Sequence, residues 1–332
     1  MRYRLIVNRE DWPLKAPFRI SGHTFHSSAC VLVTLESDRA RGRGEAAGVY
    51  YRNDDVGNMV AQLESVRDAI ERGLDRQRLQ TLLPPGGARN ALDCALWDLE
   101  SQSSGTPAWQ LAGLSRPRPL LTTFTCGAES PEVMAARALE YTGARAIKLK
   151  LTGEPLDVER VRAVRAACPE VWLGVDANQG FSRAFLEQAM PALIAARVSL
   201  IEQPLPVGQE AQLDDFDSPI PLAADESLQG LDDLPRLRGR FRVVNIKLDK
   251  CGGLTEGLAI AHAARSAGLE VMVGNMTGTS LAMAPSFLVG QLCSVVDLDG
   301  PALLSRDREH PVSYQDGMID CPAQLWGGGQ PR

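Results

Sequence analysis

The sequence predicts an α/β protein whose larger part is a closed (β/α) barrel or a large doubly wound sheet. From about residue 116 onward, short apolar segments alternate with helical ones, which is typical of parallel strands joined by helices. The first third lacks this alternation and mixes strand and helix patterns. No GxGxxG follows a predicted strand, so the usual signature of a dinucleotide-binding sheet is missing.

Composition excludes several classes of partner. The 332 residues carry a net charge of −6 without a basic block, so neither nucleic acid nor an anionic membrane surface is an expected partner. No apolar run approaches the roughly 20 residues that span a bilayer, and the charged first residues do not resemble a signal peptide. Seven cysteines without a CxxC pair predict a reducing compartment, and we expect a cytoplasmic protein. The sequence leaves the oligomeric state open and is compatible with a homo-oligomer.

The first third predicts an α+β domain. Strands are expected at residues 4–7 and 29–35, and helices at 55–73 and 88–102, where apolar residues recur at three- and four-residue steps. The stretch LAGLSRPRP (111–119) indicates a boundary. We therefore expect a first domain over residues 1–115, a catalytic (β/α) domain over 116–300, and a segment over 301–332 that returns to the first domain.

Eight strands are predicted in the second domain. Their sequences are LLTTFT, AIKLKL, VWLGVDA, SLIEQP, PLAADES, VVNIKLD, VMVGN and SVVDLD. The helices expected between them cover residues 131–142, 154–167, 182–196, the neighbourhood of 214, 231–238, 253–267 and 282–292.

Three acids end consecutive predicted strands. Asp176, Glu202 and Asp225 are separated by 26 and 23 residues, about one βα unit each, so they return to the same level of a barrel. The carboxyl ends of barrel strands form the active-site face. Each acid alone could cap a helix or end a strand, but three converging carboxylates require a cation. All-oxygen ligation suits Mg²⁺ or Mn²⁺. No histidine occurs near these positions, which argues against zinc.

Lysines flank these acids. In AIKLKL, Lys148 and Lys150 leave the chain on the same face, and Lys247 ends the sixth strand, across the acid-bearing strands from Lys150. Taken alone, AIKLKL is also compatible with a half-exposed strand. In the predicted site, the neighbouring ammonium and the metal would lower a lysine pKa enough to make it a base. Asp249 is expected to orient Lys247.

Five motifs resemble the enolase superfamily, and in particular its muconate-lactonizing subgroup. They are KLK (148–150), DAN (176–178), EQP (202–204), DES (225–227) and KLDKCGG (247–253). The resemblance implies a (β/α)7β TIM-type barrel with an N-terminal α+β capping domain that the C-terminal tail completes. It also implies Mg²⁺ at the three acids and a lysine as the catalytic base.

Within this subgroup, DLDGP (297–301) resembles the Asp-x-Asp motif of dipeptide epimerases, whose two acids hold the free α-ammonium of the substrate. The alternative is a strand that ends in a turn. The stretches ARNALDCALWDL (88–99) and VNIKLDKCGGLTE (244–256) are similar to L-Ala-D/L-Glu epimerases. The resemblance thus implies 1,1-proton transfer at the C-terminal α-carbon of a dipeptide, with Lys150 and Lys247 on opposite faces and Lys148 supporting Lys150. Further substrate contacts are expected from Asp297, Asp299, Thr125, Asn178 and Asp249.

Side-chain specificity is expected to reside in two capping segments, both predicted to be loops, near residues 19–28 and 48–55. In Ala-Glu epimerases the first carries an Arg that pairs with the substrate's glutamate, whereas RISGHTFHSS has only Arg19, before its tip. A glutamate could still meet Arg19, Arg52 or a protonated histidine. Equally, Phe25 and the tyrosines of GVYYRNDD could line an apolar pocket. The substrate contacts expected from these segments are Phe25, Tyr51 and Arg52, and His23 and His26 are expected to be solvated.

Other readings remain open at this point. An N-acylamino acid racemase, a cycloisomerase or a dehydratase could share the barrel and the metal. An N-acylated or amine-free substrate would, however, have little use for Asp297 and Asp299. A non-catalytic barrel is a further alternative, against which the intact lysines and acids argue.

Overall fold

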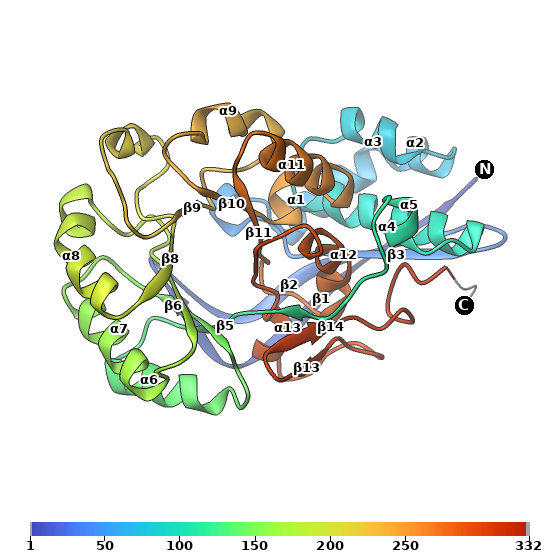
Figure 1. The fold of residues 1–332 in the computed structure, drawn as a ribbon. Helices are drawn as coiled ribbons and strands as arrows, with labels where there is room; N and C mark the ends of the chain where they lie inside the picture. The colour runs from blue at the N-terminus through green and yellow to red at the C-terminus, as the bar shows by residue number, and fades with distance from the viewer. Residues whose placement is uncertain (1, 330–332) are drawn as a thin grey trace.

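The larger domain is a closed parallel barrel. The computed structural model describes residues 2–329 and places eight strands in sequential order. Thr123 donates its backbone N–H to the carbonyl of Val296 at 2.9 Å, which joins the last strand to the chain just before the first. This order confirms the barrel and excludes a doubly wound sheet (Figure 1). The strands are β5 (Phe124–Cys126), β6 (Ala146–Lys150), β7 (Trp172–Asp176), β8 (Val198–Glu202), β9 (Leu222–Ala224), β10 (Val243–Ile246), β11 (Glu270–Val273) and β12 (Val295–Val296).

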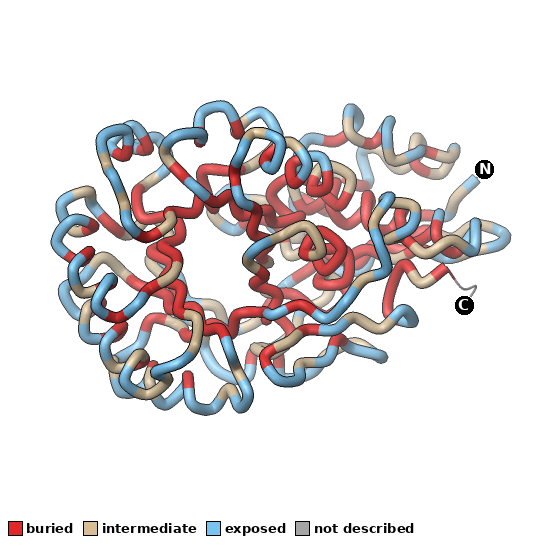
Figure 2. The backbone as a smooth tube through the Cα atoms, viewed as in Figure 1, coloured by how far each residue is buried: buried red, intermediate tan, exposed pale blue. Residues whose placement is uncertain are grey.

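Helices surround the barrel. They are α6 (Pro131–Glu140), α7 (Leu156–Ala167), α8 (Arg183–Ala195), α9 (Leu234–Leu237), α10 (Leu248–Cys251), α11 (Leu254–Ser266), α12 (Ser280–Gly290) and α13 (Gly300–Leu303). The helix expected near residue 214 is only a 3-10 turn, η2 (Glu210–Leu213). Another 3-10 turn, η3 (Leu231–Asp233), precedes α9. Figure 2 shows the buried strands as an inner ring and the exposed helix faces outside it.

The capping domain begins with a long hairpin. Its strands are β1 (Arg4–Ile20) and β2 (His23–Glu36), and they pair as far as Ile20 and His23. The segment 19–28, which the sequence predicted as a loop, is therefore mostly strand, and only Ser21 and Gly22 form the turn. Gly22 has a φ of +72°, which glycine adopts without strain. Side chains along this hairpin alternate between its two faces.

The rest of the capping domain packs a helix against the sheet. Strand β3 (Arg41–Ala46) pairs with β2, and α4 (Gly87–Ser104) lies so close to β3 that a Cβ at Gly44 would be 2.1 Å from the carbonyl oxygen of Ala91. The remaining elements are η1 (Tyr50–Arg52), α1 (Val56–Ser65), α2 (Arg67–Glu71), α3 (Arg76–Leu82) and α5 (Ala108–Leu111). None of the helices in residues 2–329 combines the length and apolar character needed to cross a membrane.

The last segment of the chain connects the two domains. Strands β13 (Ser313–Gln315) and β14 (Met318–Asp320) form a small sheet with β4 (Leu120–Leu121). Beyond them, the indole N–H of Trp326 donates to the carbonyl of Arg43 in β3 at 2.9 Å.

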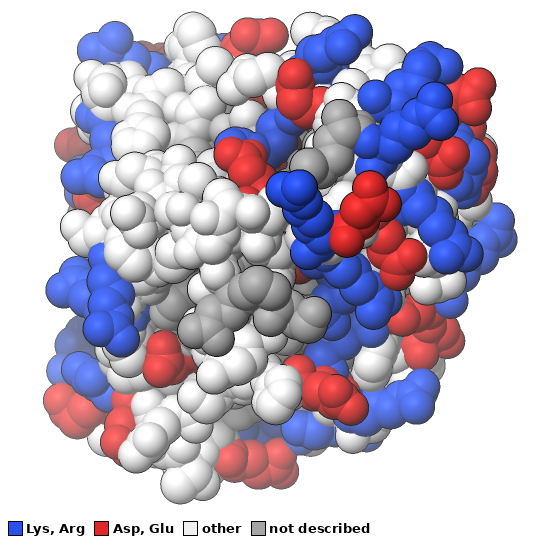
Figure 3. Space-filling model, turned by 90° about the vertical axis from the view of Figure 1, so that its right-hand side faces the viewer, with Lys and Arg blue, Asp and Glu red and all other residues white. Residues whose placement is uncertain are grey.

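The face shown in Figure 3 carries interspersed acidic and basic side chains beside a largely uncharged region.

We expect Glu45→Ala to lower the free energy of unfolding by about 3 kcal/mol. The buried Glu45 carboxylate accepts hydrogen bonds from the Thr279 backbone N–H at 2.8 Å and from Arg308 Nη2 at 2.6 Å, so its removal leaves a partly buried guanidinium without that partner. Urea unfolding measures the loss. The matched control is Glu36→Ala, which removes surface pairs with Arg4 at 3.6 Å and Arg41 at 3.9 Å and should cost less than about 1 kcal/mol. Similar losses in both variants would contradict the prediction.

Candidate active site

The three predicted acids meet at one end of the barrel. Asp176 and Glu202 are the last residues of β7 and β8, and Asp225 directly follows β9. All three are buried, and each offers an oxygen within 4.8 Å of an oxygen of the others. A buried set of three carboxylate oxygens fits the ligand preference of Mg²⁺.

Lysines contact all three acids. Lys150 Nζ lies 2.5 Å from Asp176 Oδ2, and Lys247 Nζ lies 2.8 Å from Asp225 Oδ2. Lys148 Nζ lies 3.1 Å from Glu202 Oε2 and also contacts Asp297. Strand β6 is buried along its whole length, which excludes the half-exposed strand as an explanation of its lysines.

Two of these lysines face one cavity from opposite sides. Lys150 ends β6 and Lys247 follows β10, so the three acid-bearing strands lie between them. Both side chains line the same cavity of about 240 Å³ between the barrel and the capping domain. This placement agrees with the position expected for each lysine from strand order.

The lysine pKa values differ from expectation. Burial lowers the pKa of Lys148, but the charges of Asp297 and Glu202 outweigh burial and hold it well above its usual value. The pKa of Lys247 is likewise raised, against burial, chiefly by Asp225. Burial and Asp176 in turn raise the pKa of Glu202 to about 7. The acids therefore set the lysine charge, and a lysine that works as a base requires their charge to be neutralised.

Asp297 and Asp299 lie at the seam where the barrel closes. Asp297 accepts a hydrogen bond from Thr123 Oγ1 at 2.5 Å, and Asp299 accepts one from the Thr125 backbone N–H at 2.7 Å. Burial, followed by the charge of Asp297, raises the pKa of Asp299 to about 6. The motif thus places two neighbouring buried carboxyls beside Lys148, and Thr125 contacts both of them.

Asp249 does not orient Lys247 as expected. It lies in the first turn of α10, and its Oδ1 accepts the backbone N–H of Gly48 in the capping domain at 2.8 Å. Lys247 bonds to Asp225 instead. Because α10 begins directly after Lys247, the chain turns there and directs Asp249 away from the cavity.

This position predicts a pH-dependent stability effect. Burial raises the pKa of Asp249 to about 7, so the folded protein binds this proton more tightly than the unfolded chain. The penalty for the charged form therefore appears as pH rises from about 4 through 7. Asp249→Asn keeps an acceptor for Gly48 and should raise the free energy of unfolding by at least about 1 kcal/mol at pH 8. Chemical denaturation at pH 5 should show a smaller gain, and equal gains at both pH values would contradict this explanation.

Sequence reasoning missed Lys250 and Glu226. Lys250 Nζ lies 2.5 Å from Asp225 Oδ1, and Glu226 accepts from Asn178 Nδ2 at 3.2 Å. A compositional signal was available, because the chain has 30 arginines but only five lysines, four of which surround the acids. Arginine cannot be deprotonated in proteins, whereas a lysine pKa responds to its surroundings, so this preference is itself a sign of chemistry.

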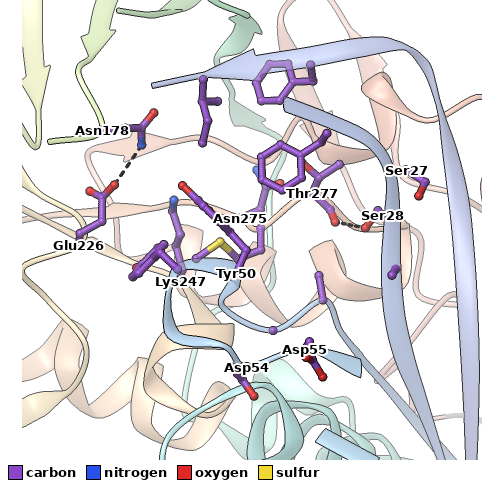
Figure 4. A pocket seen from close by; sticks show the side chains of 18 of the residues that line it. Ser27, Ser28, Tyr50, Asp54, Asp55, Asn178, Glu226, Lys247, Asn275 and Thr277 are labelled. Atoms are coloured by element: carbon purple, nitrogen blue, oxygen red, sulfur yellow. Dashed lines mark hydrogen bonds between the residues drawn. The ribbon is translucent and has the colours of Figure 1, made fainter. Parts of the chain in front are cut away.

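The cavity lies between these groups and the capping domain. In Figure 4, Glu226 and Asn178 stand on one side, and Ser28, which donates to the carbonyl of Thr277, stands on the other. Of the expected capping contacts, Phe25 and Tyr51 line the cavity. Arg52 does not, because its exposed guanidinium donates to Gln229 Oε1 at 2.9 Å.

Comparisons with known proteins match the whole architecture. Residues 2–113 match the mandelate racemase/muconate lactonizing enzyme N-terminal domain, and residues 132–329 match the enolase C-terminal domain-like model. An L-Ala-D/L-Glu epimerase of Escherichia coli is 39% identical over 94% of this chain and 98% of its own.

Two solved structures are also similar. An enolase family member from Agrobacterium tumefaciens with bound sodium and L-Ala-L-Glu is 40% identical, with a TM-score of 0.95 over 98% of this chain and 100% of its own. A dipeptide epimerase from Enterococcus faecalis, complexed with Mg and L-Leu-L-Tyr, is 28% identical, with a TM-score of 0.88 over 97% of this chain and 98% of its own.

Proposed function

The chain belongs to the mandelate racemase/muconate lactonizing enzyme family of the enolase superfamily, and on this premise we propose that it is an isomerase, an Mg²⁺-dependent dipeptide epimerase. The observation that carries the proposal is the pair Lys150 and Lys247, which line one cavity from opposite sides of three buried carboxylates. Two opposed bases suit inversion at a carbon, whereas a dehydratase needs one base and an acid for its leaving group.

The reaction is a 1,1-proton transfer at the α-carbon of the C-terminal residue. One lysine takes the α-proton as the C–H bond breaks, and the other delivers a proton to the opposite face as a new C–H bond forms. Lys148, which contacts Glu202 and Asp297, places a further ammonium close to the acids. Its positive charge opposes the negative charge that develops on the substrate in the transition state.

Asp176, Glu202 and Asp225 would hold the metal. When bound, Mg²⁺ supplies a positive charge that favours the developing negative charge of the substrate. The same three acids bond to the lysines in this structure, so ligands and bases form one network.

Asp297 and Asp299 would receive the α-ammonium of the dipeptide. Their two neighbouring buried carboxyls, beside Thr125, favour a cationic partner. An N-acylated amino acid offers no such cation, so an N-acylamino acid racemase would have little use for these two acids.

The seven cysteines are all free thiols, which supports a cytoplasmic location. A homo-oligomer remains compatible with this function.

The test is proton exchange in D₂O. The purified protein with Mg²⁺ and a set of L,L-dipeptides should incorporate deuterium at the C-terminal α-carbon and yield the L,D-epimer, both detected by mass spectrometry and chiral separation. N-acetyl amino acids serve as the competing substrate class. Exchange in N-acetyl amino acids and in none of the dipeptides would replace the epimerase by an N-acylamino acid racemase.

A further inference from the structure

The cavity has mostly apolar walls on its capping-domain side. The hairpin contributes Phe18, Ile20 and Phe25, and the second capping segment contributes aromatic rings. The Phe25 and Tyr50 ring centroids lie 5.2 Å apart at 90°, and those of Tyr50 and Tyr51 lie 5.1 Å apart at 88°. Such edge-to-face contacts favour this arrangement of the rings, which together form one aromatic wall.

The apolar wall faces the side chain of the reacting residue. The reacting α-carbon must lie between Lys150 and Lys247, which line this cavity. The amino end of the substrate would be held at Asp297 and Asp299, neither of which lines it. The cavity is therefore left for the side chain on the α-carbon.

This cavity is poorly suited to a glutamate side chain. Among the residues that the structure describes, its only cationic lining residues are Lys150 and Lys247, both bonded to buried acids. Its other ionisable lining groups, apart from the tyrosines, are the acids Asp54, Asp55, Asp225 and Glu226. A γ-carboxylate would thus lose its hydration without gaining a cation.

Strand geometry explains why no arginine supplies a positive charge to the cavity. Phe18 and Ile20 line the cavity, and Arg19, between them on β1, is exposed and does not. Phe18 pairs with Phe25 across the hairpin, and His26, next to Phe25, is also exposed. Arg19 and His26 therefore lie off the cavity, while Phe18 and Phe25 line it.

We propose that the enzyme selects dipeptides whose C-terminal residue carries an apolar side chain, aromatic or branched aliphatic, and that Phe25 determines this specificity. The inference rests on the proposed epimerase function and specifies its substrate class. It sets this chain apart from its Ala-Glu epimerase relative. A cationic side chain would likewise lose its hydration against the apolar wall formed by Phe18, Ile20 and Phe25.

The test compares kcat/KM for α-proton exchange in L-Ala-L-Phe, L-Ala-L-Leu, L-Ala-L-Glu and L-Ala-L-Lys at pH 8. The Phe and Leu dipeptides should exceed the Glu and Lys dipeptides by at least about tenfold, which corresponds to roughly 1.4 kcal/mol. Phe25→Arg should reverse the order of the Phe and Glu dipeptides. Phe25→Leu, which stays apolar, and Arg19→Ala, on the other face of the hairpin, should both preserve the wild-type order.

A wild-type preference for the Glu or the Lys dipeptide would overturn the inference and leave the epimerase function intact. A Phe25→Arg variant that exchanges both dipeptides with the wild-type ratio would overturn the role of Phe25. Exchange in none of the four dipeptides would overturn the epimerase function together with this inference.

Discussion

Replacing Lys150 or Lys247 by alanine should lower epimerisation by about 10²–10⁴-fold, because each variant lacks one of the two bases. The remaining lysine can still take the α-proton from its own face and return deuterium to it. Each variant should therefore exchange one epimer, L-Ala-L-X or L-Ala-D-X, without producing the other. Mass spectrometry of the two epimers, incubated separately in D₂O, measures this and assigns each lysine to one face.

The matched control is Lys15→Ala. Lys15 is the one lysine of the chain away from the acids, and it donates to the carbonyl of Ala302 at 2.8 Å on the surface. This variant should epimerise at the wild-type rate. If Lys150→Ala and Lys247→Ala exchanged the same epimer, the assignment of opposed bases would be wrong.

Asp176→Asn should abolish the stabilisation that Mg²⁺ gives to the folded protein. A ligand that binds only the folded state adds about 2.7 kcal/mol at 100 times its Kd, so saturating Mg²⁺ should raise the Tm of the wild-type protein and EDTA should reverse this. The variant keeps an acceptor for Lys150 but loses the charge that the cation needs. Thermal unfolding with and without Mg²⁺ measures the difference, and epimerisation should fall in parallel.

A second acidic cluster provides the control. Glu10, Cys30 and Glu45 also bring potential ligand atoms together, but Arg308 contacts both glutamates there. We therefore expect Glu10→Gln to keep the full Mg²⁺-dependent rise in Tm. Loss of that rise in Glu10→Gln, with its retention in Asp176→Asn, would assign the metal to this cluster instead.

Local patterns in the sequence predicted alternating β/α units and several of the candidate site residues, and the family resemblance favoured the barrel over a doubly wound sheet. Two-residue alternation identified the shared face of Lys148 and Lys150, and the regular length of a βα unit brought Asp176, Glu202 and Asp225 together. Both are short-range regularities, so they can be recognised without knowledge of the fold. The same regularities could not reveal that α10 begins just after Lys247 and turns Asp249 towards Gly48.

The sequence by itself thus predicted the alternating β/α units, the three acids and the two lysines, because predicted strand ends place these groups, whereas the strand order that closes the barrel was decided by the tertiary structure. Only the tertiary structure decided which capping residues face the substrate. Phe25 reaches the cavity and Arg19 does not because β1 and β2 continue as a hairpin to Ile20 and His23, which assigns neighbouring side chains to opposite faces. The lysine charge was likewise decided in three dimensions, since it depends on carboxylates that are distant in sequence and meet only in the closed barrel.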